Sequence, residues 1–272
     1  MSILEHLDQL VSAPSKGIDS LREDVLAGRA TAGEYAQATF KEVDGEGSQE
    51  NSFAANPASP FQDFWGMLSN MVQGRKRYND QEMAALGIDN DFIADQEGFE
   101  TTGYVPNSGK SGVTVSSGVD LGQMNEADLR GLGLASPLAD RLKPYLGAKR
   151  DEAQSVLRQK PLRLTEGEAY DLDLAFKKKQ ARQLRNKWEK SSGQSWDDLT
   201  PYQRTVLYSV AHQYGTDLES ATPKFWQAAT TGDWRGVLKE LRDFGDSYKS
   251  RRNREADYLQ AGLRNNSKRM FK

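Results

Sequence analysis

The 272-residue sequence contains no cysteine and only two histidines, His6 and His212. Without cysteine, the chain has neither disulfides nor thiolate chemistry. With two histidines, a histidine-rich metal site and a Ser-His-Asp triad are nearly excluded. We therefore expect acid–base chemistry near neutral pH to depend on carboxylates, with no cofactor and no bound metal.

Long hydrophobic runs are also missing. Hydrophobic residues make up 37% of the chain and charged residues 28%, and no stretch approaches the ~20 apolar residues that span a bilayer. Residues 1–11 include Glu5 and Asp8 and lack the basic start and continuous apolar core of a signal peptide. The sequence therefore predicts a water-facing, helix-rich protein without a membrane span or a secretion signal.

Charge is distributed unevenly along the chain. Residues 1–100 contain 7 Lys/Arg and 18 Asp/Glu, whereas residues 101–272 contain 29 and 21. A basic domain is attracted to anionic polymers, and nucleic acid and bacterial wall both qualify. The acidic first part argues against a dedicated nucleic-acid binder, so we expect no nucleic-acid partner.

Composition divides the chain into four segments. Residues 1–43 have the pattern of short helices and predict an attachment or delivery region, and residues 44–60 have the Gly-, Ser- and Pro-containing composition of a linker. Residues 61–88 predict an amphipathic connecting segment. Residues 89–272 predict one helix, a small sheet within a Gly/Ser-rich stretch, and then many helices. This order indicates an α+β domain with a small β lobe, a larger helical lobe and a cleft between them.

Local signals place several helix starts. Thr165 with Glu168, and Thr200 with Gln203, match the capping box, in which the two side chains satisfy each other's free backbone N–H groups. Asp233 is expected to cap a later helix. These positions predict long helices in the second half of the chain.

Several prominent side chains favour structural roles. Tryptophans at helical spacing are expected in the core: Trp188, Trp196, Trp226 and Trp234. Residues 177–179, three successive lysines, are expected on one solvated helix edge. His212 lies on an apolar helix, which favours a packed core histidine over a catalytic one. The basic residues Arg251, Arg252 and Arg254 are expected to pair with nearby acids: Asp243, Asp246 and Glu255.

Hydrolysis of a glycosidic bond needs a carboxylic acid that protonates the leaving oxygen. Glu97 is predicted at the end of a helix, where Gly98 would let the chain turn sharply and leave the carboxyl facing a cleft. Phe92, Ile93 and Phe99 would exclude water and favour the neutral acid. On these residues alone, a solvated helix end stays open as the alternative.

The same reaction needs a group that activates or holds water on the other face of the sugar. Thr114, Ser116 and Gly118 alternate onto one face of a predicted strand, and a turn after Gly118 would bring Asp120 to the same end. Asp120 is then a candidate base, and Thr114 a candidate that orients the water.

Several motifs, in order, resemble the catalytic domain of pesticin, a bacteriocin whose killing domain is similar to the T-even phage lysozymes. Near the candidate acid they are Glu97-Gly98, Tyr104-Val105-Pro106, and the segments at 111–114 and 118–122. Further motifs lie at 199–204, 211–215, 232–234 and 251–256. The resemblance covers about two thirds of the chain, and the order of its motifs makes it more specific than any one of them.

This resemblance implies a lysozyme-like muramidase, which cleaves the β-1,4 bond between N-acetylmuramic acid and N-acetylglucosamine in bacterial peptidoglycan. It implies Glu97 as the acid, with Asp120 and Thr114 at the nucleophilic water. Glu100, one residue past Phe99 in a predicted loop, is the nearest rival and is expected to be solvated, and the Glu-Gly match favours Glu97. In most phage lysozymes of this group the Asp precedes the Thr, whereas Thr114 precedes Asp120 here, as in the pesticin branch. Candidate substrate-binding residues are Ser116, Ser117 and Tyr104, although serines in such turns are mostly structural.

The biological setting has several alternatives at this point. We favour a phage virion, where the enzyme would serve in the tail or be injected during entry. Other settings are a secreted antibacterial toxin that reaches the target-cell periplasm, with an immunity protein as partner, and a free endolysin. Two alternatives concern the activity itself: a lytic transglycosylase, and a catalytically dead lysozyme fold in a virion. Residues 1–88 would contact tail proteins in the first case and the immunity protein in the second.

Overall fold

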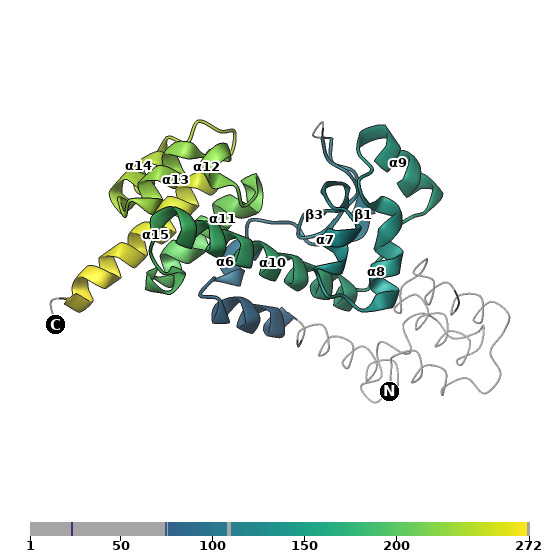
Figure 1. Cartoon of the computed structure of the whole chain (residues 1–272), viewed down its shortest axis with the longest axis horizontal. Helices are drawn as coiled ribbons and strands as arrows, with labels where there is room; N and C mark the ends of the chain where they lie inside the picture. The colour runs from purple at the N-terminus through teal and green to yellow at the C-terminus, as the bar shows by residue number, and fades with distance from the viewer. Residues whose placement is uncertain (1–22, 24–73, 75, 108–109, 271–272) are drawn as a thin grey trace, which may run out of the picture. The chain divides into compact units, whose positions relative to one another are not determined.

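A computed structural model describes residues 23, 74, 76–107 and 110–270, with side chains up to residue 264. The predictions for residues 1–43 and 44–60, and for most of 61–88, lie outside the described residues. The chain divides into two compact units. Among the described residues, one unit comprises 23, 74, 76–77, 99–107 and 110–173, and the other comprises 78–98 and 174–270. The long helix α10 (Glu166–Ser192) contains residues of both units (Figure 1).

The first unit contains a small antiparallel sheet in the order β1-β2-β3. Its strands are β1 (Glu100–Tyr104), β2 (Thr114–Ser116) and β3 (Val119–Asp120). Short helices follow: η1 (Leu121–Gln123), α7 (Glu126–Arg130), α8 (Ser136–Leu142), η2 (Lys143–Tyr145) and α9 (Arg150–Gln159). The predicted α+β pattern is confirmed, because one helix and a small sheet precede the run of helices.

The β2–β3 hairpin turns at residues 117–118. Gly118 has a φ of 87°, in the left-handed region that glycine adopts without steric cost. The turn pairs Val115 with Val119 and Thr114 with Asp120 across the two strands. Thr114 and Asp120, six positions apart in the sequence, therefore become direct neighbours in the sheet.

Two glycines close the base of this hairpin. A Cβ atom on Gly112 would lie 2.5 Å from Cα of Gly122 and 2.4 Å from the carbonyl oxygen of Ala148. A Cβ on Gly122 would meet the same carbonyl oxygen at 2.4 Å. Real Cβ contacts do not come this close, so the two backbone segments approach each other only because both residues lack a side chain.

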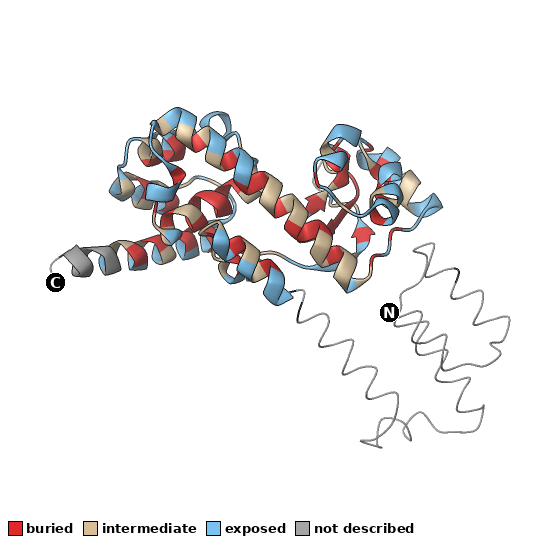
Figure 2. Ribbon diagram, turned by 60° about the horizontal axis from the view of Figure 1, so that its bottom comes forward, coloured by how far each residue is buried: buried red, intermediate tan, exposed pale blue. Residues whose placement is uncertain are grey.

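The second unit is helical. After the helical residues 78–85 it contains α6 (Asn90–Ala94), the later part of α10, η3 (Trp196–Asp198), α11 (Pro201–Tyr214), α12 (Leu218–Ala221), α13 (Pro223–Thr230), α14 (Trp234–Arg242) and α15 (Lys249–Met270). Every residue from 205 to 211 on α11 is buried (Figure 2). Helix α11 is therefore the centre of this unit.

The predicted helix starts are confirmed. Thr200 and Gln203 form a capping box at the start of α11. Thr165 and Glu168 exchange the same pair of bonds at the start of α10, with N···O distances of 2.8 and 3.2 Å. Asp233 accepts a hydrogen bond from the backbone of Gly236. These local bonds satisfy N–H groups that a helix leaves unpaired at its start.

The tryptophan prediction is also confirmed. Trp188, Trp196 and Trp226 are each at least 96% buried, and Trp234 packs against the same cluster. Ring centroids of Trp188 lie 6.0–6.4 Å from those of the other three. These rings form the core at the end of α10 that belongs to the second unit.

The lysine prediction is wrong for Lys177. Its side chain is buried, and its ammonium group donates to Oδ1 of Asn90 at 2.9 Å. The neighbouring Lys178 pairs with Glu82. This edge of α10 contacts the helical residues 78–85 and α6 through Lys178 and Lys177, and Lys178 stays partly exposed. Among the residues that the structure covers, no helix combines the length and apolar character needed to cross a membrane.

We predict that Gly112→Ala destabilises the protein by about 2 kcal/mol or more, because the new methyl group overlaps backbone atoms that cannot swing away. Thermal and denaturant unfolding, followed by circular dichroism, measure the change. Gly167→Ala is the matched control, since a Cβ at that position in the first turn of α10 meets no atom within 4 Å. Equal unfolding midpoints for the two variants would show that the glycine contact is unimportant.

Candidate active site

Glu97 lies in the turn that follows α6. Its backbone N–H donates to the carbonyl oxygen of Ala94 at 3.1 Å. Asp89, which caps α6 through the N–H of Phe92, donates its own N–H to Thr205 on α11 and accepts from the hydroxyl of Tyr258 on α15. Helix α6 is thereby bonded to α11 and α15, which sets the position of the Glu97 backbone relative to both.

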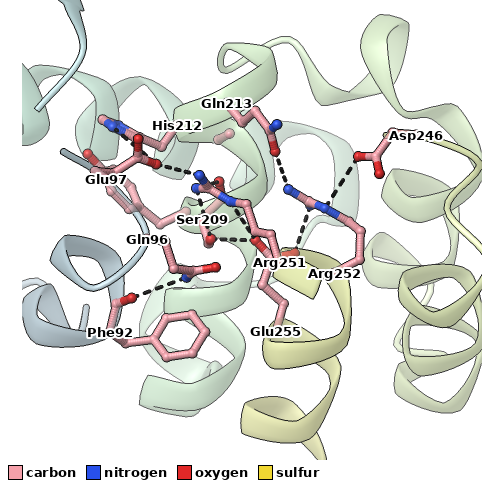
Figure 3. Close-up of polar contacts among 12 residues, drawn as sticks. Phe92, Gln96, Glu97, Ser209, His212, Gln213, Asp246, Arg251, Arg252 and Glu255 are labelled. Carbon is pink, nitrogen blue, oxygen red and sulfur yellow. Dashed lines mark hydrogen bonds and ion pairs between the residues drawn. The ribbon is translucent and has the colours of Figure 1, made fainter. Parts of the chain in front are cut away.

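The Glu97 carboxyl is held through one of its two oxygens. Oε1 accepts a hydrogen bond from Nη1 of Arg251 at 2.5 Å, and Nε2 of His212 lies 3.9 Å from the same oxygen (Figure 3). Within the described part of the chain, Oε2 has no hydrogen-bond partner. The side chain keeps 19% of its exposure, so one oxygen is fixed and the other is left for a ligand.

Three groups fix Arg251 in turn. Nη2 donates to the carbonyl oxygen of Ser209 at 3.1 Å and contacts its hydroxyl at 3.3 Å. Nε lies 3.4 Å from Oε1 of Glu255, which also accepts from the Ser209 hydroxyl at 2.5 Å. The planar guanidinium group is therefore held along several edges, which leaves Nη1 aimed at Glu97.

A second arginine completes the network around the fully buried Glu255. Nη1 of Arg252 lies 2.7 Å from Oε2 of Glu255, Nη2 donates to Gln213, and Nε lies 3.5 Å from Asp246 (Figure 3). Burial lowers the pKa of Arg252, and the Glu255 charge opposes this shift. Burial likewise raises the pKa of Glu255, against the effect of both arginines and the Ser209 hydroxyl. Each arginine thus has an acidic partner other than Glu97.

The network determines which nitrogen of His212 carries a proton. Nε2 of Gln180 donates to the carbonyl oxygen of Ala211 at 3.4 Å, which directs Oε1 of the amide toward His212. This oxygen accepts from Tyr208 at 3.1 Å and lies 3.0 Å from Nδ1 of His212. Since an amide oxygen only accepts, Nδ1 must be protonated. In the neutral ring, the unprotonated Nε2 then faces Glu97.

His212 is therefore both a packed histidine and a neighbour of the candidate acid. The side chain is 5% exposed and stacks on Tyr208, as a core position predicts. The apolar positions of α11 gave no signal of the contact with Glu97. The predicted pairing of the basic cluster is confirmed for Arg251 and Arg252, but the bond from Arg251 to Glu97 was not predicted.

The β2–β3 hairpin positions the other candidate residues, which belong to the first unit. Oδ1 of Asp120 accepts from the backbone N–H groups of Gly112 and Gly122 at 3.0 and 2.9 Å. Oδ2 is contacted by the side-chain amide of Gln123 at 3.3 Å. Thr114, opposite Asp120, is buried, and its hydroxyl lies 3.3 Å from the carbonyl oxygen of Gly112. The glycine contact thus aims the Asp120 carboxylate.

The candidate substrate-binding residues differ in accessibility. Ser116 is buried, has a φ of 56° and donates to the carbonyl oxygen of Ala169 at 3.0 Å, which joins the hairpin to the first turn of α10. Ser117 is also buried, whereas Tyr104 is 41% exposed. The described contacts give Ser116 a structural task, and Tyr104 offers the most exposed surface of the three.

Two details near Glu97 differ from expectation. Gly98 does not have a left-handed φ, and a Cβ there would meet no atom within 4 Å, so neither backbone strain nor crowding requires this glycine. Arg251 and His212 lie beside the Glu97 carboxyl, whereas the sequence predicted only the apolar neighbours Phe92, Ile93 and Phe99. Glu100 is exposed at the start of β1, as a solvated rival would be.

A family model for the C-terminal domain of pesticin, described as a bacterial toxin homologue of phage lysozyme, matches residues 87–235. This match spans more than half of the chain. The chain belongs to the pesticin family. A comparison with curated proteins gave no match.

Membership of the pesticin family supports a lysozyme-type peptidoglycan hydrolase or toxin in general, and confirms the lysozyme-like α+β fold. The matched range contains Glu97, Thr114, Asp120 and His212. Arg251 lies beyond its end, so the structure, and not the match, brings this residue to Glu97.

At the edge of the network, the Tyr214 hydroxyl donates to Asp246 at 2.7 Å, and burial together with this bond raises the pKa of Tyr214 to about 12. Between about pH 10 and 12, an unfolded tyrosine has lost its proton while native Tyr214 keeps it. The contribution of Tyr214 to stability is thus complete below pH 10 and is lost as the pH rises toward 12.

We predict that the free energy of unfolding falls more steeply between pH 10 and 12 in the wild type than in Tyr214→Phe. Denaturant unfolding at a series of alkaline pH values measures both slopes. Tyr104→Phe, at an exposed position, should keep the wild-type slope. A Tyr214→Phe slope equal to that of the wild type would contradict the expectation.

Proposed function

We propose that this domain is an N-acetylmuramidase that hydrolyses the β-1,4 bond between N-acetylmuramic acid and N-acetylglucosamine in peptidoglycan. The observation that carries the proposal is the Glu97 carboxyl, with Oε1 fixed by Arg251 and Oε2 without a partner in the described residues. A general acid needs this arrangement, because the oxygen that carries the transferable proton must be able to reach the substrate. The pesticin family match supports the same class of reaction.

In this proposal Glu97, in its neutral form, donates its proton to the glycosidic oxygen as the bond to the leaving sugar breaks. The carboxylate that results gains a full negative charge, and Arg251 already stands beside it to stabilise that charge. The arginine therefore favours the product of proton transfer without having to move during the reaction.

We propose that Asp120 accepts a proton from the attacking water and that Thr114 helps to orient that water. The backbone N–H groups of Gly112 and Gly122 occupy Oδ1 of Asp120, which leaves Oδ2, with its weaker contact to Gln123, as the basic oxygen. The pairing of Thr114 with Asp120 places both on neighbouring strands. Water attack on the face opposite the leaving group would invert the anomeric centre.

We favour a virion-borne enzyme that opens the wall during phage entry, with residues 1–88 as the attachment region. The acidic composition of residues 1–100, against the basic remainder, supports a separate task for the first part of the chain. The description of the matched family as a toxin homologue supports the alternative of an antibacterial effector. Recovery of the protein from purified phage particles would favour the virion, and a dedicated inhibitor that protects the producing cell would favour the toxin.

We predict that Glu97→Gln abolishes the release of reducing ends from purified peptidoglycan, with a loss of at least about 10²-fold, because glutamine cannot donate the proton. Glu100→Gln, which neutralises the neighbouring exposed carboxylate, should retain the wild-type rate. Mass spectrometry of the wild-type products should show reducing ends.

Three results would count against this function. Wild-type activity in Glu97→Gln would exclude Glu97 as the acid, and anhydro ends would indicate a lytic transglycosylase. No products from the wild type on several wall chemotypes would indicate a catalytically dead lysozyme fold.

A further inference from the structure

Glu97 poses an electrostatic problem. As the acid of the proposed muramidase it must carry a proton, yet its Oε1 touches the permanently charged guanidinium group of Arg251. A cation at this distance favours the ionised carboxylate, which cannot donate a proton. Some other group must offset the charge of Arg251 if Glu97 is to be protonated.

Glu255 is placed to offset it. The Glu255 side chain is fully buried, and its oxygens contact Nε of Arg251 at 3.4 Å and Nη1 of Arg252 at 2.7 Å. Asp246 supplies a second negative charge on the far side of Arg252. With Glu97 neutral, the two arginines are thus balanced by Glu255 and Asp246, and the cluster carries no net charge.

We propose that Glu255 is a positioning residue for the acid: its buried charge neutralises Arg251, so that Glu97 is not required as a counter-ion and can hold a proton. The inference rests on the proposed role of Glu97 and adds a residue that never touches the substrate. Glu255 acts through Arg251, which it holds together with Ser209.

Other charged groups around Glu97 fit this assignment. His212 from α11 faces Oε1 with the nitrogen that is unprotonated in the neutral ring, so it adds a positive charge only when both ring nitrogens carry a proton. The remaining polar neighbours in the described network are uncharged or lie beyond Arg252: Ser209, Gln213, Gln96, Gln180, Asp246 and Tyr214. Glu255 is the carboxylate that shares Arg251 with Glu97.

Replacing Glu255 by glutamine leaves the shape nearly unchanged and removes the balancing charge. Arg251 then attracts the ionised form of Glu97 more strongly, so Glu97 loses its proton at lower pH. We expect the alkaline limb of the pH–activity profile of Glu255→Gln to move to lower pH. The activity of Glu255→Gln should be about tenfold lower than that of the wild type on that limb. The difference should shrink toward acidic pH, where Glu97 is protonated in both proteins.

Asp257→Asn is the matched control. This substitution also removes one carboxylate from α15, but Asp257 is 66% exposed and pairs with Arg242 instead. We expect its pH profile to coincide with that of the wild type. A purely structural role of Glu255 would lower activity by the same factor at every pH, so a Glu255→Gln profile of unchanged shape would overturn the proposal.

A second measurement covers the possibility that Glu255→Gln does not fold, because it leaves a buried arginine with less compensation. The Glu97 carboxyl carbon can be titrated by ¹³C NMR and assigned as the resonance that is missing in Glu97→Gln. Comparing Arg252→Gln with the double variant Arg252→Gln/Glu255→Gln removes the Glu255 charge while Arg251 stays in place, and the number of buried arginines falls together with the number of buried acids. We expect the titration midpoint to be lower in the double variant, and equal midpoints would overturn the proposal.

Failure of this inference can be told apart from failure of the proposed function. If Glu97 is not the acid, Glu97→Gln retains activity whatever happens at Glu255. If Glu97 is the acid but Glu255 only packs the core, Glu97→Gln is inactive while the Glu255→Gln profile keeps its shape.

Discussion

The helical unit depends on one bond between distant parts of the chain, from Arg251 on α15 to Glu97 after α6. The two residues are 154 positions apart, and the bond forms only because α11 supplies Ser209 as a platform for the guanidinium group. Burying an arginine is costly unless its donors and its charge are satisfied. Ser209 and Glu255 meet this requirement for Arg251, so the network is both a support for the fold and the setting of the candidate acid.

The sheet unit obeys a different constraint, which is steric. Gly112 and Gly122 let two backbone segments meet, and their N–H groups converge on one oxygen of Asp120. The Asp120 carboxylate is therefore aimed by main-chain groups, whereas the Glu97 carboxyl is aimed by charged side chains. Both solutions leave one carboxyl oxygen less committed than the other, which the acid and base roles that we propose for these residues require.

The features that could be predicted from the sequence depend on residues only a few positions apart. The capping boxes at Thr165 and Thr200 depend on residues three positions apart, and the turn at Gly118 brings Thr114 opposite Asp120 within one hairpin. The α+β order and the tryptophan core follow from composition and periodicity. The contacts of Arg251, His212 and Lys177 could not be predicted, because each depends on a partner more than 80 positions away. Periodicity assigned His212 correctly to the packed face of α11 but carries no information about what that face meets.

The most direct test of this account is a double-mutant cycle on the free energy of unfolding, with Glu97→Gln, Arg251→Gln and the double variant. If the bond is formed as described, the two substitutions should be coupled by about 1 kcal/mol or more, because both side chains are largely buried. Effects that add to within about 0.5 kcal/mol would show that Arg251 does not hold Glu97, and the electrostatic account of the acid would then be wrong.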